Sequence, residues 1–179
     1  MGGWELIPRG QAIRAYYLWT PILVFCALLQ VTLMPHLTVA GVQPDLALAA
    51  VVCWALCRGA ADGAVGGLLA GLVLDLLSGA PFGVHTFTMT LVGAAAGLAA
   101  ALVPREHAML LPGMAVFCTI LQQAACVSLL RAAGWPLGWT QPVVVVVIIA
   151  AVLNLLLTII LYPWVGRLGR ALPQGESGW

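Results

Sequence analysis

Few side chains in this sequence could do chemistry, and most of them are isolated from one another. Cys53 and Cys57 are four residues apart, so on a helix they would share a face and could offer two ligands to a metal ion. Zinc usually takes about four ligands, and no histidine or further cysteine lies at a companion spacing, so small apolar packing residues are the favoured interpretation. His36, His85 and His107 are scattered, and no general base lies next to a nucleophile. We therefore expect no enzymatic activity, no metal site and no cofactor.

Asp75 is a carboxylate in an otherwise apolar stretch, AGLVLDLLSGAPFGVH. An acid inside a membrane costs about 2.5–3.5 kcal/mol, and near the C-terminus of a helix the macrodipole disfavours its charge further. Some group must offset these costs, and the candidates on the same side of the membrane are Ser78, His85, Thr86 and Arg131. The favoured interpretation is that Asp75 ties the end of its helix to the following turn and to the next helix. Direct contact with a partner or ligand, and a proton relay, are the alternatives.

Small residues form rows around Asp75. The first row has a spacing of four residues and leads to Asp75, and a second row lies on the following segment: Gly63, Gly67 and Gly71, then Gly93 and Gly97. Such rows let helix backbones approach closely in a membrane. We expect them to pack the two helices on each other or on a helix of a partner protein.

The composition is that of a membrane protein. Of the 179 residues 63% are hydrophobic and only 7% are charged, against about 25% charged in a soluble domain. The net charge of +1 provides no basic surface for nucleic acid, so a nucleic-acid partner is not expected. The first apolar run is too long for a signal peptide, which predicts an uncleaved first span.

The elements that must position these residues are six apolar segments, which predict an all-α, polytopic membrane protein with six transmembrane helices. They are Tyr17–Pro35, Asp45–Cys57, Gly59–Leu77, Val84–Val103, Leu110–Leu130 and Val143–Leu161. The second is short for a full crossing, so its flanks extend it or the bilayer is thinner there. Residues 1–16 form the expected N-terminal segment, 17–164 the transmembrane domain and 165–179 the C-terminal tail.

The arginines predict the orientation. With both termini in the cytoplasm, six of the seven arginines face inward and only Arg131 faces outward. Aromatic residues near the segment ends, among them Trp19 and Trp164, are expected at the membrane–water interface.

The remaining polar residues are expected to stabilise the bundle. Asp45 and Asp62 stand at the start of the second and third segments, where a carboxylate caps free amides. Four amide side chains inside the spans are expected to bond neighbouring helices rather than a substrate, namely Gln30, Gln122, Gln123 and Asn154.

The order of these motifs resembles the MreD family of bacterial rod shape-determining proteins. The sequence has LLQ at the end of the first span, Pro44–Asp45 before the second, and Asn154 followed by the YPW of residues 162–164. The sharpest piece is the G-x-x-x-D-L-x-S-G-x-x-x-G pattern from Gly71 to Gly83, which includes Gly79. The resemblance implies a non-enzymatic subunit of the cell-elongation machinery, which directs peptidoglycan synthesis in the inner membrane. The partners that it implies are MreC, a one-span protein, together with MreB, RodA and a penicillin-binding protein.

The mechanism that we expect is a bundle whose small-residue faces bind a transmembrane helix of the partner. The residues expected to carry structure or partner contact are Gly63, Gly67, Gly71, Asp75, Gly79, Gly83, His85, Gly93, Gly97, Arg131 and Asn154. The family also resembles the vitamin-binding subunits of energy-coupling-factor transporters, which makes a ligand-binding subunit the alternative function. The Ala-x-x-x-Ala motif that is typical of the first helix of those subunits is missing here. A small channel or transporter is a third possibility, although no inverted repeat is clear.

Overall fold

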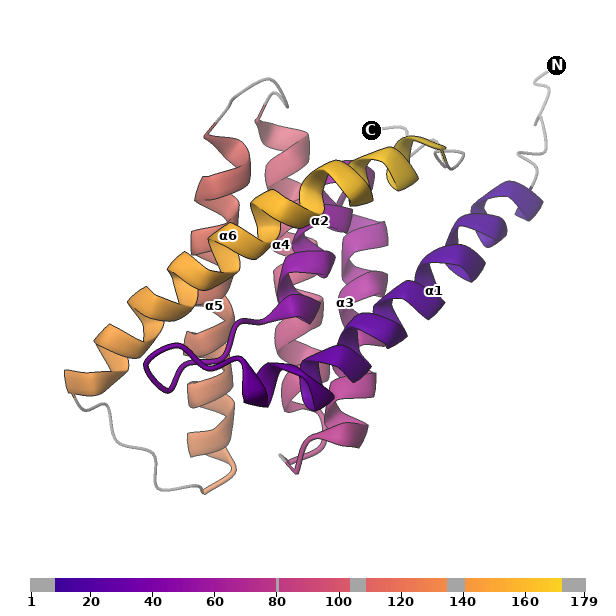
Figure 1. Ribbon diagram of the computed structural model, residues 1–179. Helices are drawn as coiled ribbons and strands as arrows, with labels where there is room; N and C mark the ends of the chain where they lie inside the picture. The colour runs from indigo at the N-terminus through magenta and orange to yellow at the C-terminus, as the bar shows by residue number, and fades with distance from the viewer. Residues whose placement is uncertain (1–8, 80, 104–108, 135–140, 172–179) are drawn as a thin grey trace, which may run out of the picture.

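The computed structural model describes residues 9–79, 81–103, 109–134 and 141–171. These residues form six α-helices and one short 3-10 helix (Figure 1). The elements are α1 (Arg9–Thr32), η1 (Met34–His36), α2 (Leu46–Arg58), α3 (Ala60–Leu77), α4 (Val84–Leu102), α5 (Leu110–Ala132) and α6 (Gln141–Ala171).

The helices confirm the predicted all-α membrane architecture. Each of the six predicted segments corresponds to one α-helix, and all except α2 contain a stretch long and apolar enough to cross a membrane. The start of α1 and the end of α6 lie toward the same end of the bundle, as an even number of crossings requires (Figure 1). We call this the termini end, and we call the opposite end, which carries the turn between α3 and α4, the α3–α4 end.

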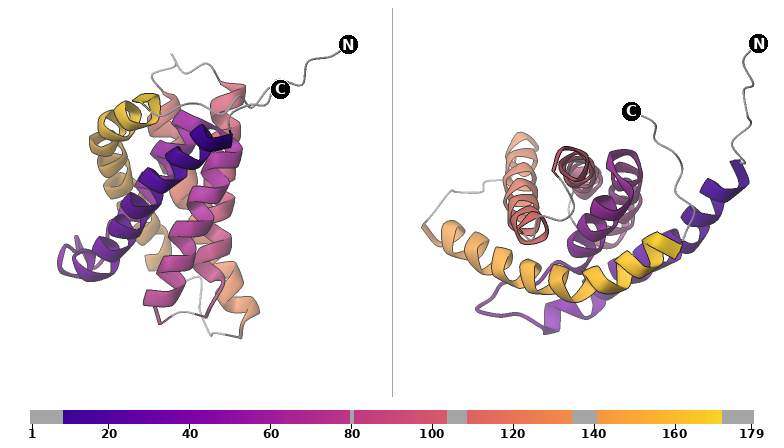
Figure 2. Two further views of the ribbon diagram at one scale, coloured as in Figure 1. Left: turned by 90° about the vertical axis from the view of Figure 1, so that its right-hand side faces the viewer. Right: turned by 90° about the horizontal axis from the view of Figure 1, so that it is seen from above.

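Two helices run further than their predicted segments. α1 begins at Arg9, and α6 continues through Pro163 to Ala171 although proline suggested an end there. Proline is tolerated inside transmembrane helices because neighbouring groups satisfy the freed carbonyl. The 31 residues of α6 span about 46 Å, which exceeds a hydrocarbon core of about 30 Å. Accordingly, α1 and α6 lie slanted across the steeper helices α3, α4 and α5 (Figures 1 and 2).

The shortest helix, α2, is the centre of the packing. It contacts each of the other five α-helices, and every residue from Ala47 to Leu56 is buried. Its 13 residues span about 20 Å, less than a bilayer core. Both hydrophobic clusters of the described residues are built around α2 side chains, one toward α4 and α5 and the other toward α1 and α6. The flanks do not extend the helix, since the chain before it is non-helical from Leu37 to Asp45.

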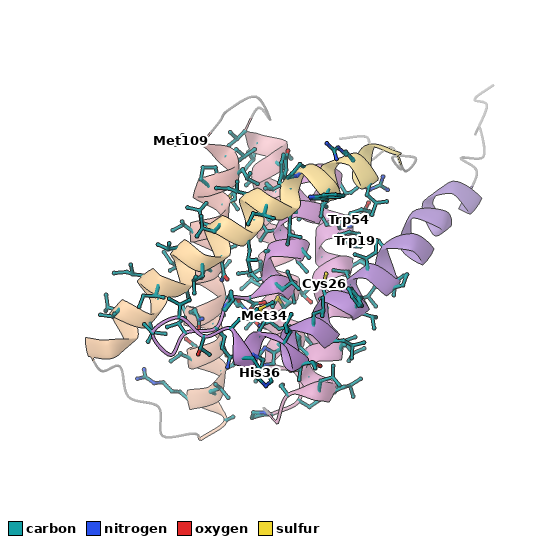
Figure 3. The ribbon with its side chains drawn as sticks, in the orientation of Figure 1. Trp19, Cys26, Met34, His36, Trp54 and Met109 are labelled. Atoms are coloured by element: carbon teal, nitrogen blue, oxygen red, sulfur yellow. The ribbon has the colours of Figure 1, made fainter. Side chains whose placement is uncertain are left out.

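A buried aromatic pair lies near the termini end. Trp19 of α1 stacks on Trp54 of α2 with ring centroids 4.1 Å apart and planes 8° apart (Figure 3). Trp19 is only 2% exposed, so its predicted place at the membrane interface was wrong. The reason is that the ring packs inside the bundle, on Trp54 of α2 and beside Gly66 of α3. Trp164, in contrast, is 69% exposed on α6.

The turn between α2 and α3 differs from the prediction in one detail. The N-cap of α3 is Gly59, and no side chain caps it. Asp62 lies in the first turn of α3, where its charge complements the positive helix end as predicted, but it is not the N-cap residue and it pairs with Arg58 at 2.8 Å. Arg58, the last residue of α2, lies beside the first turn of α3 and forms an ion pair with the carboxylate of Asp62.

Candidate functional site

The glycine rows of α3 and α4 face each other. A Cβ atom at Gly67 would lie 2.6 Å from the carbonyl carbon of Met89, and one at Gly71 would lie 2.7 Å from the carbonyl carbon of His85. Gly63 and Gly93 oppose each other in the same way. Real Cβ atoms do not approach so closely, so the two backbones could not keep this distance with any larger residue.

At the termini end, Gly97 of α4 rests on the backbone of Gly59 and Ala60. We call this contact, formed by Gly63, Gly67, Gly71, Gly93 and Gly97, the glycine seam. Of the two alternatives that the sequence left open, packing within the chain is the one observed.

Asp75 continues the row of α3 and caps α4. Its Oδ2 accepts hydrogen bonds from the backbone N of Gly83 at 2.9 Å, the backbone N of Thr86 at 2.9 Å and Oγ1 of Thr86 at 2.6 Å. Its Oδ1 accepts one from the backbone N of His85 at 2.9 Å. α4 has no side-chain cap of its own at Gly83, so the carboxylate of α3 satisfies amides that the start of a helix leaves free. The prediction that Asp75 ties α3 to the turn and to α4 is therefore confirmed.

The turn between α3 and α4 requires one of its glycines. Gly83 has a φ of +100°, which favours glycine over any residue with a Cβ. Gly79 has open space around its Cβ position and shows no such constraint. Arg131 lies in the last turn of α5, where its carbonyl accepts a hydrogen bond from the N of Gly134 at 2.9 Å.

A second polar cluster holds the start of α2. Asp45 caps the helix by accepting from the N of Leu48 at 2.9 Å, as predicted. Its backbone N donates to Oδ1 of Asn154 on α6 at 2.7 Å, and its Oδ2 accepts from Nε2 of Gln122 on α5 at 2.8 Å. Nδ2 of Asn154 also donates to Oγ1 of Thr119 at 3.2 Å.

Gln30 of α1 completes this cluster through its side-chain amide. The Nε2 atom donates to the carbonyl of Pro44 at 3.1 Å, and Oε1 accepts from the N of Leu46 at 2.6 Å. The amide thus pairs with the backbone as a neighbouring β-strand would. We call Gln30, Asp45, Thr119, Gln122 and Asn154 the α2 cap cluster.

The depth of this cluster explains its composition. Gln122 lies near the middle of α5 (Leu110–Ala132) and Asn154 near the middle of α6 (Gln141–Ala171), so α2 begins in the interior of the bundle. Non-helical backbone at that depth needs partners inside the protein, because lipid offers none. The sequence correctly predicted that Gln30, Gln122 and Asn154 bond neighbouring elements. It did not show that they converge on one helix start.

A pocket of about 250 Å³ opens beside the cluster at the α3–α4 end. It lies between the end of α1, the segment before α2, the end of α3 and the start of α4, and its lining includes Gln30, Asp45, Ser78 and His85.

Comparison with protein families decides the identity. The model of the family described as "rod shape-determining protein MreD" matches residues 11–172, nearly the whole chain. The chain belongs to the MreD family. Rod-shape determination is thus the role of this MreD protein, and the resemblance seen in the sequence is confirmed. Comparison with curated proteins and with solved structures gave no match.

One segment of this MreD protein both carries the family pattern and forms the contact between α3 and α4. The Gly71–Gly83 pattern, on which the resemblance chiefly rested, holds the last seam glycine of α3, the Asp75 cap and the positive-φ turn residue. In this MreD protein the pattern therefore encodes a joint between two helices.

Proposed function

We propose that this MreD protein is a non-enzymatic scaffold subunit of the bacterial cell-elongation machinery in the inner membrane. It holds a one-span partner such as MreC in position beside MreB, RodA and a penicillin-binding protein, and so takes part in the control of peptidoglycan synthesis. Family membership supports the shape-determining role, and the partner is our inference from that membership.

The observation that carries the scaffold role is the use of the buried carboxylates. Asp75, which is 5% exposed, accepts hydrogen bonds from residues 8 to 11 positions later in the turn and α4, and Asp45 bonds α2 and α5. Acids engaged in this way fix helices relative to one another, and they favour a structural role over proton transfer. A rigid bundle is what a scaffold needs in order to position a neighbour.

The small-residue faces take an indirect part in this proposal. In the protein by itself the glycine faces of α3 and α4 pack directly against each other. A partner helix could therefore bind these faces only by separating α3 from α4. We propose that the seam shapes the surface that the partner recognises by fixing the α3–α4 pair.

The ligand-binding alternative receives less support from the pocket. Sites for drug-sized ligands commonly measure about 300–1,000 Å³, and this pocket of about 250 Å³ is smaller. A vitamin would require it to widen.

The test is co-purification of the tagged chain with the one-span partner from the same genome, combined with rescue of rod shape in cells depleted of the chromosomal copy. The wild type is expected to retain the partner and restore rods. Gly67→Ala is expected to lose both, and the adjacent Gly66→Ala, which does not face α4, to keep both. Failure of the wild type to retain the partner, or rescue by a chain that cannot retain it, would contradict the proposal.

A further inference from the structure

The pocket at the α3–α4 end has more hydrogen-bond acceptors than the protein uses. The Oγ atom of Ser78 lines it, is buried, and receives no hydrogen bond from any part of the chain that the structure describes. Asp45 lines it as well, and three donors, from Leu48, Ala47 and Gln122, use part of the acceptor capacity of its carboxylate. A buried hydroxyl without a partner is costly, so a bound group that supplies a donor would be stabilised here.

The other walls define the shape of such a group. Val31, Pro35 and Leu74 form an apolar side, which suits a short carbon stem. His85 also lines the pocket and adds a polar ring to its wall. Gln30 offers little, because both atoms of its amide are bound to the backbone around α2.

From these features we infer that the pocket binds a primary ammonium group on a short aliphatic stem. An ammonium carries three donors and a positive charge, which match the carboxylate of Asp45 and the hydroxyl of Ser78. The lining comes from the ends of α1 and α3, the start of α4 and Asp45 before α2, so the pocket runs from the α3–α4 end toward the start of α2. The ammonium comes from a phosphatidylethanolamine headgroup or from a free amine of the same chemistry.

The first experiment measures binding of ethanolamine to the full-length protein in detergent by saturation-transfer NMR. Choline is the matched ligand, because it has the same charge and stem but no N–H donor. Ethanolamine is expected to bind and choline to bind at least about tenfold more weakly, since a charge-assisted hydrogen bond contributes at least this factor. Equal binding of the two ligands, or binding of neither, would overturn the inference.

Variants connect that binding to the pocket. Ser78→Ala is expected to weaken ethanolamine binding about tenfold while the unfolding temperature of the ligand-free protein stays the same or rises, because Oγ has no bond to lose within the described chain. Ser128→Ala is the matched control, since its hydroxyl bonds the carbonyl of Ala124 on an exposed part of α5. Asp45→Asn is expected to weaken binding further if the variant folds. Unchanged binding in Ser78→Ala would refute the pocket as the site even if Asp45→Asn does not fold.

Nanodiscs then distinguish the two sources. Free ethanolamine is added to protein in phosphatidylglycerol discs that contain either phosphatidylethanolamine or phosphatidylcholine. Suppressed ethanolamine binding in the phosphatidylethanolamine discs alone identifies the headgroup as the occupant, and equal binding in both identifies a free amine. Loss of ethanolamine binding in both kinds of disc would overturn the inference for the membrane-embedded protein.

Discussion

The backbone N of Asp45 donates a 2.7 Å hydrogen bond to Oδ1 of Asn154, a residue 109 positions further along the chain. Asn154 is 2% exposed and belongs to α6, whereas Asp45 stands directly before α2. This bond joins the innermost helix of the bundle to the last helix. The helix that contacts all the others is thus bound at its start to an amide side chain from the far end of the sequence, in addition to Gln30 and Gln122.

Replacing Asn154 by leucine tests that bond. Asn154→Leu keeps the number and branching of the side-chain heavy atoms but leaves the Asp45 N–H without its acceptor, so we expect the free energy of unfolding to fall by about 1–3 kcal/mol. Thr158→Val, one turn further on α6 and equally buried, removes only a bond to the carbonyl of Asn154 and should cost no more than about 1 kcal/mol. Equilibrium unfolding in detergent measures both. Equal losses would mean that the cross-helix bond contributes nothing of its own.

Two adjacent glycines of α3 test the seam. Gly67→Ala places a methyl group against the carbonyl of Met89, and we expect a loss of about 1–3 kcal/mol from overpacking. A Cβ at Gly66 would make ordinary contacts at 3.4 Å to Trp54 and 3.6 Å to Leu23, so Gly66→Ala should be neutral or stabilise by up to about 1 kcal/mol. Thermal unfolding of both variants is the measurement. A Gly67→Ala protein as stable as the wild type would show that α3 and α4 can move apart freely.

Asp75→Asn tests the cap that α3 supplies to α4. An amide can present only one acceptor oxygen, so at least one donor among Gly83, His85 and Thr86 loses its partner. We expect the free energy of unfolding to fall by about 2–3 kcal/mol, because the lost bonds involve a charged acceptor. Thr86→Val removes only the hydroxyl bond and should cost less.

The Asp75→Asn/Thr86→Val double variant completes the cycle. Because the two groups touch, its loss should differ from the sum of the single losses. If Asp75→Asn folded, bound its partner and supported rod shape as well as the wild type, both the structural and the partner-contact role of Asp75 would be disproved.

Replacing each of the two glycines of the α3–α4 turn by alanine should change the stability by different amounts. Gly83→Ala forces a Cβ into a positive-φ conformation and should cost about 1–2 kcal/mol. Gly79→Ala meets open space and should stay within about 0.5 kcal/mol of the wild type. The unfolding temperatures of the two proteins decide this. A larger loss at Gly79 would show that the turn has a constraint beyond its backbone angles.

The sequence predicted the helices and the α3–α4 joint because both depend on local patterns. Apolar length fixes a membrane span, and the four-residue spacing from Gly63 to Asp75 places one face of α3 opposite α4. The turn is short, so Asp75 had few possible partners and the correct ones lay within eleven positions.

The α2 cap cluster could not be predicted in the same way. Gln30, Asp45 and Asn154 are far apart in the sequence, and hydropathy does not show at which depth α2 begins. Trp19 was misplaced for a related reason. Its general preference for the interface is overridden by a specific neighbour, Trp54, on which its ring stacks.

The position of α2 also determines when its start can be stabilised during synthesis of the chain. A ribosome delivers this helix early, yet the side chains that neutralise its exposed start, Gln122 and Asn154, emerge 77 and 109 residues later. Until then the backbone N–H of Asp45 lacks its acceptor on Asn154, and the carboxylate of Asp45 lacks its donor on Gln122. A product that terminates before α6 leaves this N–H without its acceptor, so we expect it to be less stable than the full bundle.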